Sequence, residues 1–389
     1  MSDIHILIDC IGRGGAEKIV VTLANELARQ GHSVTLLLLR RNIGYELNEK
    51  VKLLTMSDKP FPKGWLHSVG ELLRGLWWTR RTLEASGTKH TFLLSNLTRS
   101  NLINIALAVV MPHHRAFCVS HASVDYYRKR GIGRTFLLMA EGLFFPLAYR
   151  TICVSKRMTA DYQRLWKFRK NSVITIYNPV HTGTSLASSG GSVSQKPTTV
   201  HIGMVARLHP VKRHDLALRA MRILKESRPG HYVLHIMGEG PQEQAIRSMV
   251  AELNLGDRVV MHGWTDEPGE ILRGCAMTLL CSDTEGFPNS VVESLASGIP
   301  VVATDCVSGP RELLAPHLDV EQEIEFQEGF LPTAHGVLVR VGDPEALARG
   351  IEYQACRSSL ERNTECIAFA KQFEPARIAR EYTDLLAGP

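Results

Sequence analysis

The sequence predicts an α/β protein made of two Rossmann-like halves, and three observations support this class. Residues 5–39 read as an apolar strand, a glycine-rich turn, an amphipathic helix at 16–30 and a second strand. Residues 277–304 repeat this order, with a helix at 290–297 between two apolar strands. A chain of 389 residues is long enough for two or three domains that each bury a core.

The remaining elements follow the same alternation of strand and helix. Further helices are expected at 242–253, 343–356 and 363–387, with Pro375 breaking or kinking the last one. The acidic stretch 317–335 is expected to be irregular. Further strands are expected at 92–96, 116–120, 152–155, 200–205, 232–237, 259–261 and 336–341.

The bulk composition favours a cytoplasmic protein with reduced thiols. The longest apolar runs, at 102–111 and 136–148, are shorter than the roughly 20 residues of a membrane span. No secretory signal opens the chain, so a cytoplasmic start is expected. The eight cysteines are scattered, without a CxxC pair or a Cys/His cluster, and this excludes a disulfide framework or a zinc site.

The charge is divided unevenly along the chain. Residues 1–180 contain 26 Lys and Arg against 12 Asp and Glu, whereas the remainder contains 19 against 27. This asymmetry predicts that the first half meets an anionic partner.

The segment 279–305 contains the features that point most directly to chemistry. Glu285 lies in the turn before its helix, and Glu293 follows eight residues later within that helix. Pro288 precedes the helix, so the backbone N–H groups of Asn289 and Ser290 can bind a phosphate. A diphosphate at this position would have one carboxylate on each side.

The motifs EGFPNSVVE, ASGIPVVAT and SGPREL resemble those of the retaining nucleotide-sugar glycosyltransferases of family 4, and the likeness extends along nearly the whole chain. An ordinary βαβ crossover would account for the strands but not for the two glutamates. The resemblance implies the GT-B fold, in which two Rossmann-like domains face a central cleft. It gives an acceptor-side domain at 1–181, a flexible linker at 182–197, a nucleotide-sugar domain at 198–373 and a final helix at 374–389 that crosses back.

Two candidate sites belong to the N-terminal half. The loop GRGGAEK contains Gly14 and Gly15, but it is not GxGxxG, and arginines rather than an acidic residue end the second strand, so a dinucleotide site is not expected. The glycines alone could simply turn the chain, whereas the resemblance implies a contact with the donor. His121 follows a predicted strand, where a packed or capping role is the alternative to the place beside the donor sugar that the resemblance implies.

The C-terminal half supplies the remaining donor-binding candidates. Arg207 and Lys212 flank a proline turn, match the Arg/Lys pair of the resembled family and could stabilise the departing diphosphate. The glycines of the turn GEGPQ fit close backbone approach to a nucleotide, with a plain strand-to-helix turn as the alternative. The resemblance implies that Trp264 borders the base, with simple packing as the alternative. These assignments are Gly238, Trp264, Gly286 and Phe287, in addition to Glu285, Asn289, Ser290 and Glu293.

Two segments of the N-terminal half favour contact with an anionic membrane surface. Residues 65–81 place Leu66, Val69, Leu73, Leu76 and Trp77 on one helical stripe, with further tryptophans and arginines around it. A helix packed on its own domain is the alternative. Residues 126–147 join a basic cluster to an apolar segment, and no nucleic-acid-binding motif accompanies the charge.

These features and the family resemblance predict a transferase that moves a hexosyl or N-acetylhexosaminyl group from a UDP-sugar to a lipid-linked sugar acceptor at the inner face of the membrane. Retention at the anomeric carbon is what the resemblance implies. No metal or other cofactor is expected, because cationic side chains would do the work of a metal, although Asp283 and Glu285 mimic a DxD pair. The alternatives are a UDP-sugar 2-epimerase or phosphorylase on the same fold, or a non-catalytic membrane-bound scaffold.

Overall fold

The computed structural model forms two compact units. It describes residues 2–60, 65–87, 91–128, 138–139, 141–169, 171–181, 199–227, 231–357 and 360–387. The first unit contains Met1–Val180 and Phe373–Pro389, and the second contains His181–Gln372. The linker expected at 182–197 lies outside the described residues.

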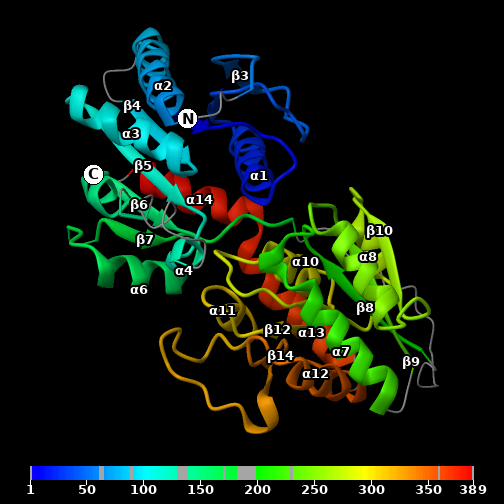
Figure 1. Ribbon diagram of the computed structural model, residues 1–389. Helices are drawn as coiled ribbons and strands as arrows, with labels where there is room; N and C mark the ends of the chain where they lie inside the picture. The colour runs from blue at the N-terminus through cyan, green and yellow to red at the C-terminus, as the bar shows by residue number, and fades with distance from the viewer. Residues whose placement is uncertain are drawn as a thin grey trace. The chain divides into compact units, whose positions relative to one another are not determined.

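The first unit is built on a parallel sheet, whose described strands have the order β3-β2-β1-β4-β5-β6-β7. Figure 1 labels β3, β4, β5, β6 and β7 of this sheet. Its strands are β1 (Asp3–Ile8), β2 (Ser33–Leu38), β3 (Val51–Thr55), β4 (Thr91–Asn96), β5 (His114–Ser120), β6 (Arg150–Cys153) and β7 (Val173–Thr175). The chain moves outward from β1 to β3 and then returns to place β4 on the other side of β1. The carboxyl ends of β1 and β4 therefore form a topological switch point, where open α/β sheets bind ligands.

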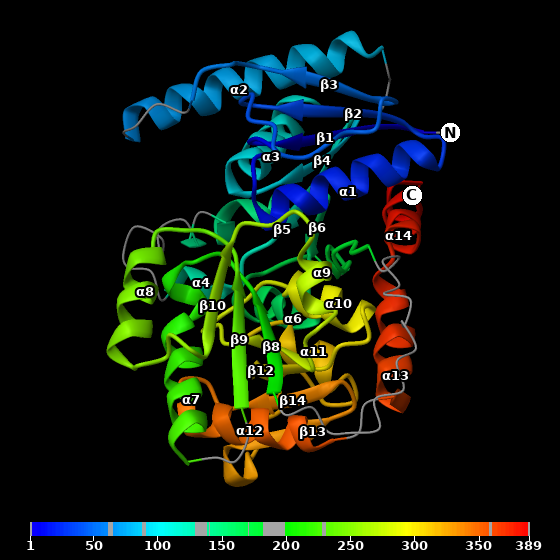
Figure 2. The ribbon, with the colours of Figure 1, turned by 90° about the vertical axis from the view of Figure 1, so that its right-hand side faces the viewer.

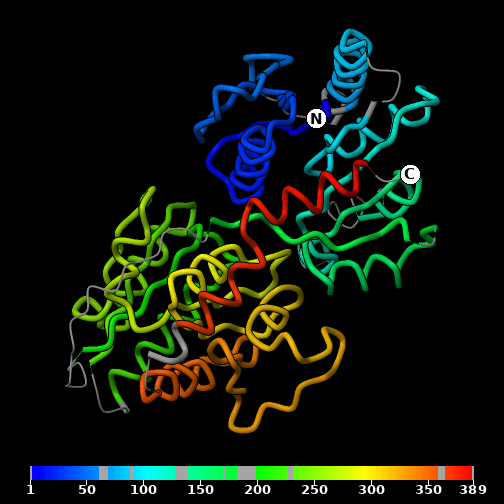
Figure 3. The backbone as a smooth tube through the Cα atoms, turned by 180° about the vertical axis from the view of Figure 1, so that it is seen from behind, coloured from blue at the N-terminus to red at the C-terminus, as the bar shows by residue number. Residues whose placement is uncertain are grey.

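Helices cover this sheet, and the chain end returns to the first unit. The helices are α1 (Gly15–Arg29), α2 (Trp65–Ala85), α3 (Thr98–Val110), α4 (Val124–Arg128), η1 (Phe145–Leu147), α6 (Lys156–Leu165) and α14 (Pro375–Ala387). Gln30, just after α1, donates a side-chain hydrogen bond of 3.1 Å to the Ala376 carbonyl of α14. Figure 3 follows the chain through this final helix.

The second unit repeats the same topology with an antiparallel addition at one edge. Its described strands have the order β10-β9-β8-β11-β12-β14-β13 and a switch point between β8 and β11; Figure 2 shows β10, β9 and β8 side by side. The strands are β8 (Thr199–Val205), β9 (His231–Met237), β10 (Val259–Gly263), β11 (Met277–Leu280), β12 (Val301–Thr304), β13 (Phe330–Thr333) and β14 (Gly336–Val339).

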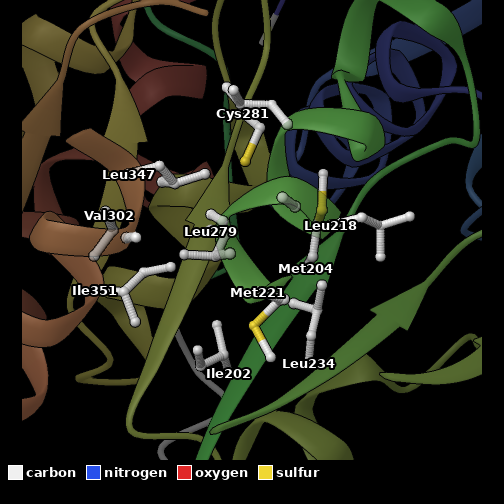
Figure 4. Packing of buried hydrophobic residues seen from close by; sticks show 14 of the residues in the cluster. Ile202, Met204, Leu218, Met221, Leu234, Leu279, Cys281, Val302, Leu347 and Ile351 are labelled. Atoms are coloured by element: carbon white, nitrogen blue, oxygen red, sulfur yellow. The ribbon is translucent and has the colours of Figure 1, made fainter. Parts of the chain in front are cut away.

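The core of the second unit lies between this sheet and two of its helices (Figure 4). Buried Met204, Leu234 and Leu279 come from the strands, and they pack in one cluster with Met221 of α7 and Leu347 of α12. Burying each such side chain contributes about 1.5–3 kcal/mol. The helices are η2 (Pro210–Lys212), α7 (His214–Ser227), α8 (Glu243–Glu252), α9 (Pro268–Leu272), α10 (Asn289–Ala296), α11 (Pro310–Leu314), η3 (Gln327–Gly329), α12 (Pro344–Cys356), α13 (Leu360–Ala370) and η4 (Lys371–Phe373).

One sequence-based expectation about the elements is wrong. The stretch 317–335 is not irregular throughout, because Phe330–Thr333 forms β13 and pairs antiparallel with β14. Pro332 is tolerated there because β13 is an edge strand. The break expected at Pro375 within 363–387 is confirmed, since α13 ends at Ala370 and Pro375 begins α14 at a position where a missing N–H costs nothing.

Two further expectations about composition can be compared with the structure. The eight cysteines form no disulfide bonds in the part of the chain that the structure describes, in line with the sequence-based expectation of reduced thiols. Of the helices that the structure describes, none combines the length and apolar character needed to cross a bilayer.

Candidate functional site

The loop after β8 carries Arg207 and Lys212 at the switch point of the second unit. His209 caps η2 by accepting a hydrogen bond from the Val211 N–H at 3.4 Å, and Pro210 begins this short helix. Lys212 ends it and lies largely buried, whereas Arg207 is exposed. The guanidinium of Arg207 has no ion-pair partner in the described part of the chain.

The structure brings Lys212 together with Glu285 from the loop after β11. The Lys212 ammonium donates to Glu285 Oε1 at 2.5 Å, and the Ser282 hydroxyl donates to the same oxygen at 2.6 Å. The lysine side chain is 18% exposed and the glutamate side chain 10%. A short, largely desolvated ion pair of this kind is stronger than a surface pair, and it fixes the direction of both side chains.

A second ion-pair cluster holds the two loops against each other. Arg213 donates two hydrogen bonds of 2.9 Å to Asp215 and one of 2.8 Å to Asp283. The Asp283 N–H also donates to the Val211 carbonyl at 3.0 Å. Burial raises the pKa of Asp215, but the hydrogen bonds and charge of Arg213 outweigh it, so the pKa is lowered.

The same contacts involve Asp283 and Glu285, the pair that mimics a DxD metal motif. The Asp283 carboxylate accepts from Arg213, and the Glu285 carboxylate accepts from Lys212, so each already has a cationic partner. Within the described residues, no group of three His, Cys, Asp or Glu side chains could hold a metal ion.

The loop from β11 to α10 is fixed on its other side by residues 307–309. The Glu285 N–H donates to the Val307 carbonyl at 3.3 Å, and the Ser308 hydroxyl donates to the Gly286 carbonyl at 3.0 Å. Gly309 has a φ of 98°, and a β-carbon there would overlap the Pro288 ring. The start of α10 is therefore held in place by a position that requires glycine.

The predicted phosphate-side and ribose-side residues lie on α10 itself. Asn289 and Ser290 are its first two residues, and half-buried Glu293 follows one turn later. Buried Phe287 and half-buried Gly286 precede the helix. The first N–H groups of a helix lack intrahelical acceptors, and this end therefore attracts anions.

The glycine turn after β9 lies against the loop that carries Arg207. Gly238 has a φ of 145°, and a β-carbon there would overlap the Ala206 carbonyl. The Leu208 N–H donates to the Glu239 carbonyl at 2.9 Å. Trp264 follows β10, is half-buried and donates from its indole N–H to Asp266 at 3.1 Å.

The first unit carries the other candidates at the carboxyl ends of its strands. Gly14 precedes α1, Gly15 begins it, and the Tyr45 hydroxyl donates to the Gly14 carbonyl at 3.1 Å. Half-buried His121 follows β5, with Nε2 2.9 Å from Asn96 Oδ1. Burial lowers the pKa of His121 to about 4, so the imidazole is neutral at physiological pH.

Several residues that organise these sites were not predicted from the sequence. Arg213 and Ser282 hold the loops of the second unit, and Asn96 orients His121. Asn96 is 3% exposed, and its amide nitrogen has no hydrogen-bond partner in the described part of the chain. The signal that could have identified Asn96 as a site residue was its position at the end of β4, next to the switch point.

Comparison with known proteins identifies the class. Residues 13–184 match the family described as Glycosyltransferase Family 4, and residues 192–372 match Glycosyl transferases group 1. A Campylobacter jejuni N-acetylgalactosamine-N,N'-diacetylbacillosaminyl-diphospho-undecaprenol 4-alpha-N-acetylgalactosaminyltransferase is 26% identical over 392 residues, covering 100% of both chains. An Escherichia coli lipopolysaccharide 1,6-galactosyltransferase is 30% identical over 154 residues, which is 39% of this chain and 41% of that one.

Solved structures show the same fold. Anabaena HepE, in complex with UDP and glucose, has a TM-score of 0.72 at 16% identity and covers 99% of each chain. The protein therefore has the α/β GT-B fold and is a glycosyltransferase. It belongs to the family 4 glycosyltransferases, as the sequence motifs predict.

Proposed function

We propose that this enzyme transfers a hexosyl or N-acetylhexosaminyl group from a UDP-sugar to a hydroxyl of a lipid-linked glycan, with retention at the anomeric carbon. The product would enter a cell-surface polysaccharide or glycolipid. The C. jejuni relative carries an undecaprenol-linked substrate in its name, and the E. coli relative is named for lipopolysaccharide. The solved HepE structure holds UDP and glucose.

The single observation that supports this proposal most strongly is the Lys212–Glu285 pair at the switch point. An ammonium has three hydrogens, and one of them is used on Glu285 Oε1, so two can reach phosphate oxygens. Glu285 Oε2 has no hydrogen-bond partner in the described part of the chain and can accept from a sugar hydroxyl. The pair can thus contact the diphosphate and the sugar of one donor molecule.

The other candidates would take roles around that donor. Arg207 would share the diphosphate charge with Lys212, and Glu293 would bind the ribose hydroxyls. The N–H groups of Asn289 and Ser290 would bind the phosphate. The remaining contacts would come from Gly238, Trp264, Gly286 and Phe287 in the second unit and from Gly14, Gly15 and His121 in the first.

The proposed reaction needs no carboxylate nucleophile from the protein. The bond between the anomeric carbon and the phosphate oxygen breaks, and the acceptor oxygen bonds to the same face of the sugar. The departing phosphate accepts the proton of the acceptor hydroxyl. Arg207 and Lys212 stabilise its developing charge, and transfer is therefore expected to continue in the presence of a chelator.

The experiment that tests this function is an assay of a panel of nucleotide-sugars with undecaprenyl-diphosphate-linked acceptors. We expect UDP release that depends on acceptor, a product with an α-linkage from an α-donor, and unchanged rates with EDTA. A sugar converted without acceptor would indicate epimerisation, and formation of a sugar 1-phosphate with inorganic phosphate would indicate a phosphorylase. A protein that neither binds nor consumes any donor would be a scaffold.

We further propose that the enzyme works at the cytoplasmic face of an anionic membrane, which it contacts through α2 and the segment 139–147. The segments predicted for this contact are residues 65–81, within α2, and 126–147, of which the structure describes 126–128, 138–139 and 141–147. On α2, Val69, Leu73 and Trp77 are spaced by four residues and are 50%, 62% and 59% exposed. Leu76 of the predicted stripe and Trp78 instead pack on the core. Helix α2 therefore has one apolar face toward the core and a second apolar face that is exposed.

Helix α2 also carries arginines beside its exposed apolar side chains. The Arg81 guanidinium lies 4.6 Å from the Trp77 ring centre, and Arg74 and Arg80 are exposed. Tryptophan and arginine together suit the interface of a bilayer with anionic lipids. Further exposed apolar side chains in the same unit are Met139, Leu143, Phe144 and Leu147. The basic residues 129, 130 and 134 lie outside the described residues.

Vesicle sedimentation tests this membrane contact. The double variant Leu73→Ala and Trp77→Ala should reduce binding to vesicles of phosphatidylglycerol and phosphatidylcholine by about tenfold or more, since each side chain loses about 1.5–3 kcal/mol of burial. Binding should also weaken in high salt. The control Val260→Ala, which changes a 42% exposed residue of the second unit, should bind as the wild type does. Equal sedimentation of all three proteins would exclude α2 as the contact.

A further inference from the structure

A buried carboxyl group in the first unit, Glu141, links the segments that follow β4 and β5. Glu141 is buried, with a relative exposure of 1%. The Thr98 hydroxyl donates to Oε1 at 2.7 Å, the Tyr127 hydroxyl donates to Oε1 at 2.8 Å, and the Tyr162 hydroxyl donates to Oε2 at 3.0 Å. No cation pairs with Glu141 in the described part of the chain, so three hydroxyl groups alone satisfy it.

A carboxyl group in this setting is costly to keep. Burial raises the pKa of Glu141, and the three hydrogen bonds offset that effect only in part. A well-packed aliphatic residue of similar volume would avoid the cost of burying this carboxyl group. The presence of the carboxyl group therefore calls for a role beyond packing.

Two series of contacts connect Glu141 with His121, one through Thr98 and one through Tyr162. Thr98 lies two residues after Asn96, whose Oδ1 faces His121 Nε2 at 2.9 Å. Leu97 between them has a φ of 71°, an uncommon conformation for leucine that needs support from its surroundings. From the other side, the Tyr162 hydroxyl lies 2.8 Å from the hydroxyl of Ser120, the residue before His121.

Glu141 is itself held by close packing. A β-carbon at the next residue, Gly142, would overlap the Trp166 indole. The same indole packs edge-on against Tyr162, with 4.6 Å between ring centres. The carboxyl group and its tyrosine partner therefore share one rigid environment, which is the condition for positioning another group accurately.

The network also defines the protonation of His121. With Asn96 Oδ1 as acceptor, the neutral ring carries its proton on Nε2. The other ring nitrogen, Nδ1, has no hydrogen-bond partner in the described part of the chain and can accept one. Rotation of either strand end would break the contact that sets this tautomer.

We propose that Glu141 is a positioning residue for His121. Through Thr98 it fixes the strand end that carries Asn96, and through Tyr162 it fixes the strand end that carries His121. The imidazole is thereby kept with Nε2–H on Asn96 and Nδ1 directed to accept a hydrogen bond. The catalytic consequence rests on the proposed function, in which His121 lines the reacting face.

The test compares Glu141→Gln and Glu141→Ala in the full chain. Glutamine keeps an acceptor oxygen for Thr98 and Tyr127, and its amide group can donate to the Tyr162 hydroxyl. We expect kcat of the Gln variant within about threefold of wild type, and kcat of the Ala variant lower by about 10–100-fold. The KM for donor should change less than threefold in both, because most of the proposed donor contacts, including those to the diphosphate and ribose, lie on the second unit.

Nitrogen NMR of the His121 ring supplies a readout that needs no turnover. Wild type and Glu141→Gln should show the Nε2–H tautomer, and Glu141→Ala should show a mixture of tautomers. If the Ala variant does not fold, Tyr162→Phe removes the hydroxyl that joins Glu141 to Ser120 while keeping the carboxyl group, and it should produce the same mixture. The control Glu84→Ala, which removes a half-exposed carboxylate from α2, should leave the ring signals unchanged.

The outcomes separate this inference from the proposed function. An unchanged tautomer in both Glu141→Ala and Tyr162→Phe would overturn the positioning role, whatever the activity. Equal loss of kcat in the Gln and Ala variants, together with weaker donor binding, would also overturn it in favour of a purely structural role. A tautomer change without any sugar transfer by the wild type would contradict the proposed function alone.

Discussion

Lys212 and Glu285 share one ion pair although they lie 73 positions apart in the sequence. Glu285 Oε1 accepts from both Lys212 and Ser282, so removing the ammonium leaves a largely buried carboxylate whose one remaining partner among the described residues is the Ser282 hydroxyl. This arrangement makes the lysine both a proposed diphosphate ligand and the counter-charge of the proposed sugar ligand.

Replacing this lysine tests its proposed role. Lys212→Met should lower kcat by about 10²–10³-fold, the usual cost of removing one group that stabilises a developing negative charge. The control Arg247→Ala removes an exposed arginine of α8 whose partner is Glu243 on the same helix, and it should leave kcat unchanged. Steady-state kinetics with a UDP-sugar measure both. Similar kcat values for wild type and Lys212→Met would show that the leaving charge is stabilised elsewhere.

Gly238 is a residue whose backbone conformation explains its identity. Its φ of 145° and the carbonyl of Ala206 leave no place for a β-carbon. Gly238→Ala should lower the free energy of unfolding by about 2 kcal/mol or more. Gly256→Ala is the matched control, because a β-carbon there meets no atom within 4 Å. Urea denaturation compares the two, and equal midpoints would contradict this account of the turn.

At the scale of elements, the long apolar patterns could be predicted from the sequence and the short edge strands could not. Periodicity predicts the helix after β1, which buries one face, and continuous apolar runs predict both strands around α10, which are buried at every position. β13 was missed because it is a four-residue edge strand containing a proline within an acidic stretch. The α2 stripe was predicted as one face, whereas the core takes Leu76 and leaves Trp77 exposed.

The candidate site was predictable to the extent that motifs describe it. Glu285 and Lys212 could be identified from their motifs, but their mutual ion pair could not, since it depends on how the loops after β8 and β11 meet. Arg213 was missed for the same reason, because Asp283 lies 70 positions away. Glu141 had a signal in the sequence, as the charged residue that interrupts the apolar run 136–148, and such a residue needs buried partners.

For the molecule as a whole, buried histidines predict how acid affects stability. Burial lowers the pKa of His214 to about 4, so it stays neutral in the folded second unit while an unfolded histidine is protonated below about pH 6.5. This contribution is complete above pH 6.5 and is lost as the pH falls toward 4. Burial also lowers the pKa values of His235 and His335 in the same unit, with the same sign.

Hydrogen exchange of peptides from β8 and β12 would measure this effect for the second unit. Between pH 7 and pH 5, His214 alone should account for about 2 kcal/mol of lost stability. The variant His214→Leu should therefore lose about 2 kcal/mol less than wild type over the same interval, after correction for the intrinsic exchange rate. The same loss in both proteins would show that His214 does not contribute to acid destabilisation.

The central claim is that a donor diphosphate is bound by Arg207, Lys212 and the beginning of α10. A crystal structure of the enzyme soaked with UDP tests it most directly. We predict phosphate oxygens within about 3 Å of Lys212 Nζ and of the Asn289 or Ser290 N–H, with the ribose beside Glu293. Density for UDP at a different position, with the Lys212–Glu285 pair unchanged and no phosphate beside α10, would contradict the claim.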